Sequence, residues 1–302
     1  MTNIYWPVYK NLEKELVELS NQVHIDDKQL DIYSVKIIEL LLRCSVEIES
    51  ISKYLFFNLG GIVPTDKDLY FDTDCIQLLE DKWLLSKKQV IASSINFHFL
   101  REENKILTPL NKANKRGTSS SDWKKAYQAV KHDRGNNLSK GNLKNLIRAM
   151  AALFILNLYY KDDKFELDKN QKIIPSNMES DIFNIKIHQY SGYDGTHKYM
   201  KKEDFDECTY IIKQSSKSEE IWKEAIDNMN NKNVELFTKH PKFLQALNRN
   251  KNLFNEYTGS NIFWDILGKD EYINVIRQSH IFLDKANKLT ENEAILNKNQ
   301  IN

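Results

Sequence analysis

Hydrophobic residues recur at three- and four-residue steps over most of the chain, and this spacing predicts amphipathic helices. The strongest run covers residues 29–58 and stops at Gly60-Gly61, as helices commonly do. The same spacing predicts further helices in the first half of the chain, over 8–23, 75–97, 122–130 and 139–160. The last of these is apolar nearly all round in its C-terminal half, so we expect it at the centre of a helical bundle.

The pattern changes after the charged stretch 161–172. Residues 181–188 alternate between apolar and other positions, and 208–213 form a second apolar run. These two segments predict strands in a β-hairpin or small sheet. Helical spacing returns over three later segments, 217–230, 232–249 and 262–288. The Asn- and Lys-rich tail from Leu289 predicts a frayed end.

These patterns together predict a mainly α protein. We expect an N-terminal helical bundle over residues 1–162, with a polar loop over 101–121. The charged stretch then separates the bundle from a smaller C-terminal region over residues 163–302, either α+β with a hairpin or helical.

Composition narrows the class of protein further. The 302 residues include 43 basic and 42 acidic side chains, a formal net charge of +1, and 41% of them are hydrophobic. These values exclude a disordered chain and disfavour a strongly charged polymer binder, although a local basic face is still allowed. The cysteines Cys44, Cys75 and Cys208 are far apart and odd in number, which fits free thiols in a reducing cytosol.

Several features that are absent from the sequence also guide the expectations. No apolar stretch approaches the roughly 20 residues that span a bilayer, and no signal peptide is visible at the N-terminus. We therefore expect a cytoplasmic protein with no membrane partner. No metal-ligand spacing, phosphate-binding loop or dinucleotide fingerprint is present either, so we expect no metal and no cofactor.

The most informative segment is a basic turn, Lys131-His132-Asp133-Arg134, between a short aromatic helix and the long apolar helix. His132 can exchange a proton near neutral pH. Arg134 can hold a phosphate through two parallel N–H bonds, and Lys131 adds a point charge. A metal-independent ribonuclease needs these parts, namely a proton donor or acceptor and a cation beside the developing phosphorane charge.

Two stretches at and before this turn have a recognisable form. Residues 43–55 read R-x-x-x-E-I-E-S-I-x-K-Y-L, and residues 123–134 read W-x-x-A-Y-x-x-V-K-H-D-R. Over roughly residues 28–160 the chain resembles bacterial HEPN-like proteins, many of which come from phage-defence and toxin–antitoxin loci. The resemblance implies a bundle of four or five helices that often forms a homodimer through the faces carrying the motif. Active members of that family are metal-independent ribonucleases.

The basic turn departs from the motif of those ribonucleases, in which an Arg is followed after four to six residues by a His. None of the seven arginines of this chain has a His at that distance, and the turn places His132 before Arg134. Two interpretations stay open. In the first, a phage-defence or toxin-type protein binds or cleaves RNA without metal, with His132 as general acid or base, Arg134 stabilising phosphate charge and Lys131 assisting. In the second, a noncatalytic HEPN-like module dimerises, docks a partner protein or antitoxin, or senses a ligand through its C-terminal region.

The turn also has a purely structural interpretation. Asp133 could cap the following helix or pair with Arg134, while Arg43 and Glu47 of the long helix could brace the turn across the bundle. Glu47 and Glu49 are alternative partners for Lys131 or Arg134.

Two other clusters of residues give weaker indications of function. Basic residues beside Trp123 could follow a nucleic-acid backbone, and we take them as candidate RNA contacts: Lys115, Arg116, Lys124 and Lys125. Histidines and tyrosines over 188–199 suggest a binding or interaction loop. We expect no zinc there, because no cysteine or acidic pattern completes a site.

Overall fold

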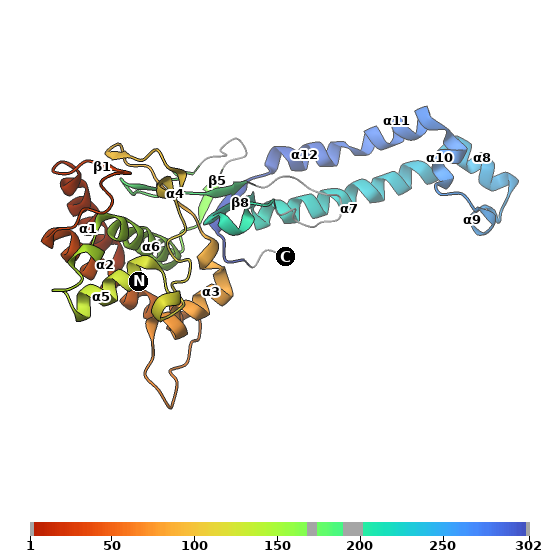
Figure 1. Ribbon diagram of the computed structural model, residues 1–302. Helices are drawn as coiled ribbons and strands as arrows, with labels where there is room; N and C mark the ends of the chain where they lie inside the picture. Colours follow the sequence, from red (N-terminus) through yellow and green to blue (C-terminus); the bar gives the residue numbers. More distant parts are fainter. Residues whose placement is uncertain (1–2, 168–173, 190–201, 300–302) are drawn as a thin grey trace. The chain divides into compact units, whose positions relative to one another are not determined.

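Four helices form the N-terminal bundle in the computed structural model, which describes residues 3–167, 174–189 and 202–299. They are α1 (Tyr5–Ser20), α2 (Val35–Asn58), α5 (Asp122–His132) and α6 (Leu143–Lys161). Helix α6 packs against each of the other three (Figure 1). Its side chains are buried on nearly every face, which confirms its predicted central place. The prediction of a mainly helical protein is also confirmed.

Capping side chains set where the two central helices begin. The Ser34 side chain accepts a hydrogen bond from the backbone N–H of Ile37 at the start of α2. Asn142 accepts one from the backbone N–H of Asn145 at the start of α6. Each cap satisfies a backbone donor that has no partner within the helix. Helix α2 therefore begins after the Ser34 cap, and residues 29–34, which we expected to be helical, lie outside it.

The helix predicted over 75–97 is wrong beyond Trp83. A π-helical turn, η1 (Phe71–Ile76), leads into α3 (Gln77–Trp83), and Leu84 then adopts a left-handed conformation with φ of 51°. After η2 (Leu85–Lys87), the chain forms strand β2 (Val90–Ala92). The β-branched pair Val90-Ile91 favours a strand once distant partner strands are available, and the local pattern carries no information on those partners.

Strand β2 is the centre of a three-stranded sheet. It pairs antiparallel with β4 (Ile106–Leu107) on one side and with β6 (Phe183–Ile185) on the other. The expected 101–121 loop therefore includes β4 and two single turns of helix, α4 (Glu102–Lys105) and η3 (Gly117–Ser119). A separate two-stranded sheet pairs β1 (Ile25–Asp26) with β3 (Phe97–His98).

A third sheet has four strands in the order β5-β9-β8-β7. They are β5 (Phe165–Leu167), β7 (Ile187–Gln189), β8 (Tyr210–Gln214) and β9 (Asn292–Leu296). Strands β7 and β8 are parallel, so the expected hairpin is wrong and the small sheet is right, because a tight hairpin joins only antiparallel strands. The expected frayed tail is also wrong over β9, which buries Ala294 and Leu296.

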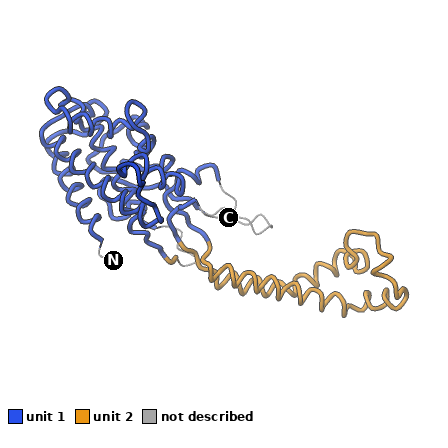
Figure 2. The backbone as a smooth tube through the Cα atoms, turned by 90° about the horizontal axis from the view of Figure 1, so that it is seen from below, with its two compact units in different colours: residues 1–165, 173–213, 294–302 blue, residues 166–172, 214–293 orange. Residues whose placement is uncertain are grey.

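The chain divides into two compact units (Figure 2). The first contains residues 1–165, 173–213 and 294–302, and the second contains 166–172 and 214–293. Our expected boundary near residue 162 lies close to the first break, but the segment 173–213 groups with the bundle.

A buried network explains why that segment belongs to the first unit. Glu13 on α1 is fully buried and accepts hydrogen bonds from the Tyr9 hydroxyl at 2.8 Å and the backbone N–H of Asp181 at 3.1 Å. Ser180 donates to the same carboxylate and lies 2.9 Å from the Tyr9 hydroxyl. A buried carboxylate needs such partners, so the network holds the start of β6 against α1.

The second unit is helical. Its elements are α7 (Ser216–Thr238), α8 (Pro241–Arg249), α9 (Leu253–Glu256), α10 (Ile262–Leu267), α11 (Lys269–Ser279) and α12 (Ile281–Leu289). Helix α7 packs against α11 and α12, and one end of the unit has a small core of Phe237, Phe243, Leu267 and Val275. The three predicted segments are helical, but their bounds are wrong. Helix α7 runs through the expected break at residue 231, and the helical run breaks instead before Pro241 and at the positive-φ Gly268. No helix among the described residues is long and apolar enough to cross a membrane.

Candidate functional site

The basic turn lies on the surface of the bundle, at the C-terminal end of α5. Helix α5 ends at His132, and the backbone N–H of Asp133 closes it by donating to the Ala129 carbonyl at 3.0 Å. The four side chains from Lys131 to Arg134 are exposed. A proton-exchanging group, His132, and two cations, Lys131 and Arg134, are therefore exposed to solvent within four consecutive residues.

Two residues of the turn are oriented by neighbours one helical turn earlier. The His132 Nε2 lies 3.2 Å from the Gln128 Oε1. The Lys131 ammonium donates to the Tyr127 hydroxyl at 3.1 Å. That hydrogen bond, followed by the nearby Glu49 carboxylate, raises the pKa of Lys131, so Lys131 stays a cation across the neutral range.

The Asp133 carboxylate is hydrogen-bonded within the loop that follows α5. It accepts from the Asn136 side-chain amide at 3.0 Å and from the Asn136 backbone N–H at 3.4 Å. The helix-capping interpretation of Asp133 is wrong, because Asn142 caps α6 and Asp133 closes a loop turn instead. No ion pair between residues that the structure describes involves Arg134.

The expected brace from α2 is not formed by Arg43 and Glu47. Arg43 donates instead to Glu15 of α1 at 2.6 Å, and Lys36 pairs with the same carboxylate. Glu47 is half-buried, and burial raises its pKa although Arg43 opposes the shift. The residue of α2 that does approach the turn is Glu49, beside Tyr127 and Lys131.

The predicted RNA-binding set is divided by the structure. Lys124 is buried and donates to the Asp72 Oδ2 at 2.9 Å and to the Ala113 carbonyl at 3.0 Å. It also donates to the backbone carbonyl of Lys115. Lys124 is therefore committed to the interior, and its assignment as a phosphate contact is corrected.

The other three members remain at the surface. Arg116 donates to the Asp72 Oδ1 at 3.0 Å and lies 3.5 Å above the Tyr70 ring. Lys125 pairs with Asp122 at 2.8 Å, and Lys115 is exposed. Two of the three positive charges are thus already paired, which lowers the net charge available to a phosphate backbone.

Asp72 joins these cations to the π-helical turn η1. Burial acts to raise the pKa of Asp72, but the hydrogen bonds from Lys124 and from the Thr73 backbone outweigh it, and the pKa lies below its usual value. Burial also lowers the pKa of Lys124 in spite of the ion pair. Asp72 is therefore the centre of a structural ion-pair cluster within the acidic segment 66–74.

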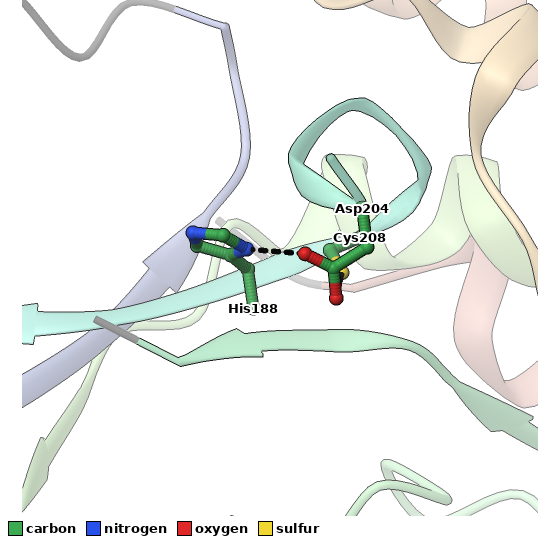
Figure 3. Close-up of side chains that lie close together, drawn as sticks. All are labelled: His188, Asp204 and Cys208. Atoms are coloured by element: carbon green, nitrogen blue, oxygen red, sulfur yellow. Dashed lines mark hydrogen bonds and ion pairs between the residues drawn. The ribbon is translucent and has the colours of Figure 1, made fainter. Parts of the chain in front are cut away.

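A second constellation lies where β7 and β8 pair (Figure 3). The His188 Nδ1 is 2.9 Å from the Asp204 Oδ1, and the Cys208 thiol donates to the Asp204 Oδ2 at 3.7 Å. The potential ligand atoms of the three residues all lie within 4.8 Å of one another. His188 and Cys208 are buried and Asp204 is partly exposed, so this set could hold a metal ion.

Two lysines border this cluster. Lys88 is buried and donates to the Asp206 carbonyl at 2.9 Å, and burial lowers its pKa to about 8. Lys186 pairs with Glu207. Burial, followed by the Asp204 carboxylate, raises the pKa of the Cys208 thiol to about 12. The thiol is therefore protonated in the protein alone.

Sequence reasoning missed Asp204 and Cys208 as partners of His188. The one local signal is the four-residue spacing of Asp204 and Cys208 across the short helix η5 (Phe205–Glu207), and that spacing is common by chance. His188 joins them only because β7 pairs with β8. The other histidine and tyrosines of the predicted interaction loop, residues 190–199, lie outside the described residues.

Comparisons with known proteins leave the site to be argued from its own geometry. No family model, curated protein or solved structure significantly matches the chain. The HEPN-like resemblance thus rests on the sequence patterns quoted above.

Proposed function

We propose that the chain is a HEPN-like protein, of the phage-defence or toxin type, that binds RNA at the basic turn and cleaves it without a metal ion. One observation carries the proposal. Lys131, His132 and Arg134 are all exposed at one helix end, while Asp133, which lies between them in the sequence, is hydrogen-bonded to Asn136. A purely structural turn gains from neutralising its arginine, whereas a phosphate-binding turn needs that charge for its ligand.

The three side chains divide the work of cleavage. Arg134 holds the non-bridging oxygens of the scissile phosphate, and Lys131 adds positive charge as the phosphorane forms. A neutral His132 that donates from Nε2 to Gln128 presents Nδ1 as an acceptor. His132 then takes the proton of the ribose 2′-hydroxyl, the O2′–P bond forms as the P–O5′ bond breaks, and water protonates the leaving O5′.

A homodimer belongs to the same proposal, because it follows from the HEPN-like resemblance. Helix α2, which carries the first half of the resemblance, exposes Val35 and Val46. Burying such side chains between two copies is favourable. The proposed dimer would bring two basic turns to one RNA strand.

The test compares wild type with the double variant His132→Ala/Arg134→Ala on tRNA and total bacterial RNA in EDTA. The matched control is His98→Ala/Arg101→Ala, which removes the same two residue types from another exposed segment. We expect wild type and control to cleave equally and the double variant to lose at least about 100-fold, since a positioned acid or base contributes that much.

Other outcomes would overturn the assignment. Equal cleavage by all three proteins would mean that the turn is not the site. Binding of RNA without cleavage by any of them would leave a binding protein and remove the catalytic roles of His132 and Arg134.

The alternative, a noncatalytic interaction module, is favoured by one feature of the second unit. Its helices α8 to α10 expose the large apolar side chains Leu244, Phe254 and Trp264, and exposed apolar groups of this size are typical of docking surfaces. If this surface mediates self-association, sedimentation of wild type will show a dimer that Phe254→Ala/Trp264→Ala abolishes. Under this alternative, neither wild type nor that variant would cleave RNA.

A further inference from the structure

We propose that His188, Asp204 and Cys208 of the first unit form a zinc-binding site. The three residues come from different places in the chain: His188 from β7, Asp204 from just before η5, and Cys208 from just after it. Their hydrogen bonds between described residues involve none of the residues of the basic turn, so we treat this site as separate from the proposed RNA site.

The distances suit a metal ion with small adjustments. Zinc binds nitrogen and oxygen at about 2.0–2.2 Å and sulfur at about 2.3 Å in a tetrahedron, which places ligand atoms roughly 3.3–3.8 Å apart. Here the Cys208 Sγ is already 3.7 Å from an Asp204 oxygen, and the His188–Asp204 distance of 2.9 Å needs only to open slightly. The remaining distance, from the Cys208 sulfur to the His188 nitrogen, is at most 4.8 Å. Side-chain rotations that move these two atoms about 1 Å closer would bring all three ligand atoms to zinc-binding distances.

The donor types select the metal. A thiolate, an imidazole and one carboxylate suit zinc and related transition metals, whereas magnesium and calcium take sets dominated by oxygen. Three protein ligands also leave a fourth position for water or a substrate. Asp204 is partly exposed, so that position and the route of entry lie on the solvent side.

The surrounding structure holds the ligands in place. In the parallel register, His188 lies opposite Ile211, and the Thr209 N–H donates to the Lys186 carbonyl at 3.0 Å. The ring of Phe205 packs edge-on against the imidazole with centroids 5.3 Å apart. Backbone pairing and ring packing therefore fix His188 and Cys208 before any ion arrives, which reduces the entropy lost on binding.

Binding has a defined proton balance. The Cys208 S–H bond breaks, its proton passes to solvent, and the sulfur lone pair forms the S–Zn bond. The imidazole stays neutral, and its proton moves through solvent from Nδ1, which faces Asp204, to Nε2, so that the Nδ1 lone pair forms the N–Zn bond. Without the ion, the same residues form the hydrogen-bonded group seen here, with Asp204 between the imidazole and the thiol. A purely structural hydrogen-bonded group of this kind is the competing interpretation.

The experiment uses the full chain, stripped of metal with a chelator, and Co²⁺ as a spectroscopic probe before Zn²⁺. We expect one Co²⁺ per chain, a near-ultraviolet thiolate-to-cobalt absorption band, and displacement by Zn²⁺. Cys208→Ser should abolish the band, and Asp204→Asn should weaken Zn²⁺ binding at least about 10-fold, by analogy with the loss of a ligand's supporting partner. The matched control is Cys75→Ser, because Cys75 is also a buried thiol whose pKa burial raises to about 12.

Several results would overturn the site. They are no stoichiometric uptake by wild type, a cobalt spectrum without the thiolate band, or equal loss in the Cys75→Ser control. If Cys208→Ser does not fold by circular dichroism, the partly exposed Asp204→Asn decides the question, and unchanged Zn²⁺ affinity in that variant contradicts the proposal.

Discussion

The Lys124 ammonium donates to the Asp72 carboxylate at 2.9 Å, and both side chains are almost fully removed from solvent. The same ammonium donates to the backbone carbonyls of Ala113 and Lys115, and Arg116 donates to the other side of the carboxylate. A buried cation with this many partners holds separate segments of the fold together. It fastens the chain around 113–116 and helix α5 to the π-helical turn η1.

Replacing Asp72 with Asn should therefore destabilise the first unit. The change leaves the Lys124 ammonium buried without its counter-charge, and breaking one partner of a buried pair costs about 3–5 kcal/mol. The measurement is the free energy of unfolding in urea. Asp68→Asn, in the exposed part of the same acidic loop, is the control and should change stability by less than about 0.5 kcal/mol. Equal effects of the two variants would contradict the role of the pair.

Acid should weaken the ion pair between Asp72 and Lys124. The pKa of Asp72 is lower in the folded protein than its unfolded value of about 3.9, so the unfolded chain binds more protons in acid. The stabilisation by Asp72 is complete above about pH 4 and is lost as the pH falls through the folded pKa. The gap in unfolding free energy between wild type and Asp72→Asn should therefore narrow below about pH 4. A gap that stays constant down to pH 3 would show that Asp72 does not titrate with folding.

The location of Lys124 shows what the sequence could and could not predict. Helical spacing predicted α1, α2, α5 and α6, because each buries a stripe that is visible locally in the residues. The same spacing places Lys124 on α5 next to the exposed Lys125, and no local pattern distinguishes them. The distinction comes from Asp72, 52 residues away, which is long-range information that one sequence does not carry.

The pairing of strands into the three- and four-stranded sheets, and the metal-ligand cluster, could not be predicted for the same reason. Strand β2 follows a helical stretch and pairs with β6, which lies more than 90 residues later along the chain. His188 lies near Cys208 because β7 and β8 pair in parallel. The expected hairpin would have paired these segments antiparallel, with a different register. The basic turn was predictable as a candidate because its four residues are consecutive. Its exposure, and the orientation of Asp133 toward Asn136, required the structure.

Destabilising the small core of the second unit should leave the stability of the N-terminal bundle unchanged. Phe243 is buried there, with ring centroids 5.0 Å from Phe263 and 5.7 Å from Phe254. Phe243→Ala should cost about 3–5 kcal/mol, and the exposed neighbour Leu244→Ala should cost little. Hydrogen exchange should show faster exchange in α8, α10 and α11 with α6 unchanged. Equal loss of protection in α6 would mean that the two units unfold together.

The charge on the basic turn should appear in the salt dependence of RNA binding. The probe is a single-stranded RNA with 2′-O-methyl groups, which cannot be cleaved through its 2′-oxygen. Each phosphate contact on a single strand contributes about 0.7 to the slope of log affinity against log salt concentration. Lys131→Gln/Arg134→Gln should therefore reduce that slope by about 1.4, the sum of two contacts. Arg101→Gln/Lys105→Gln removes the same two charges from another exposed segment and should leave the slope unchanged. A slope reduced equally by both pairs would indicate a diffuse electrostatic effect and would remove the basic turn as the RNA contact.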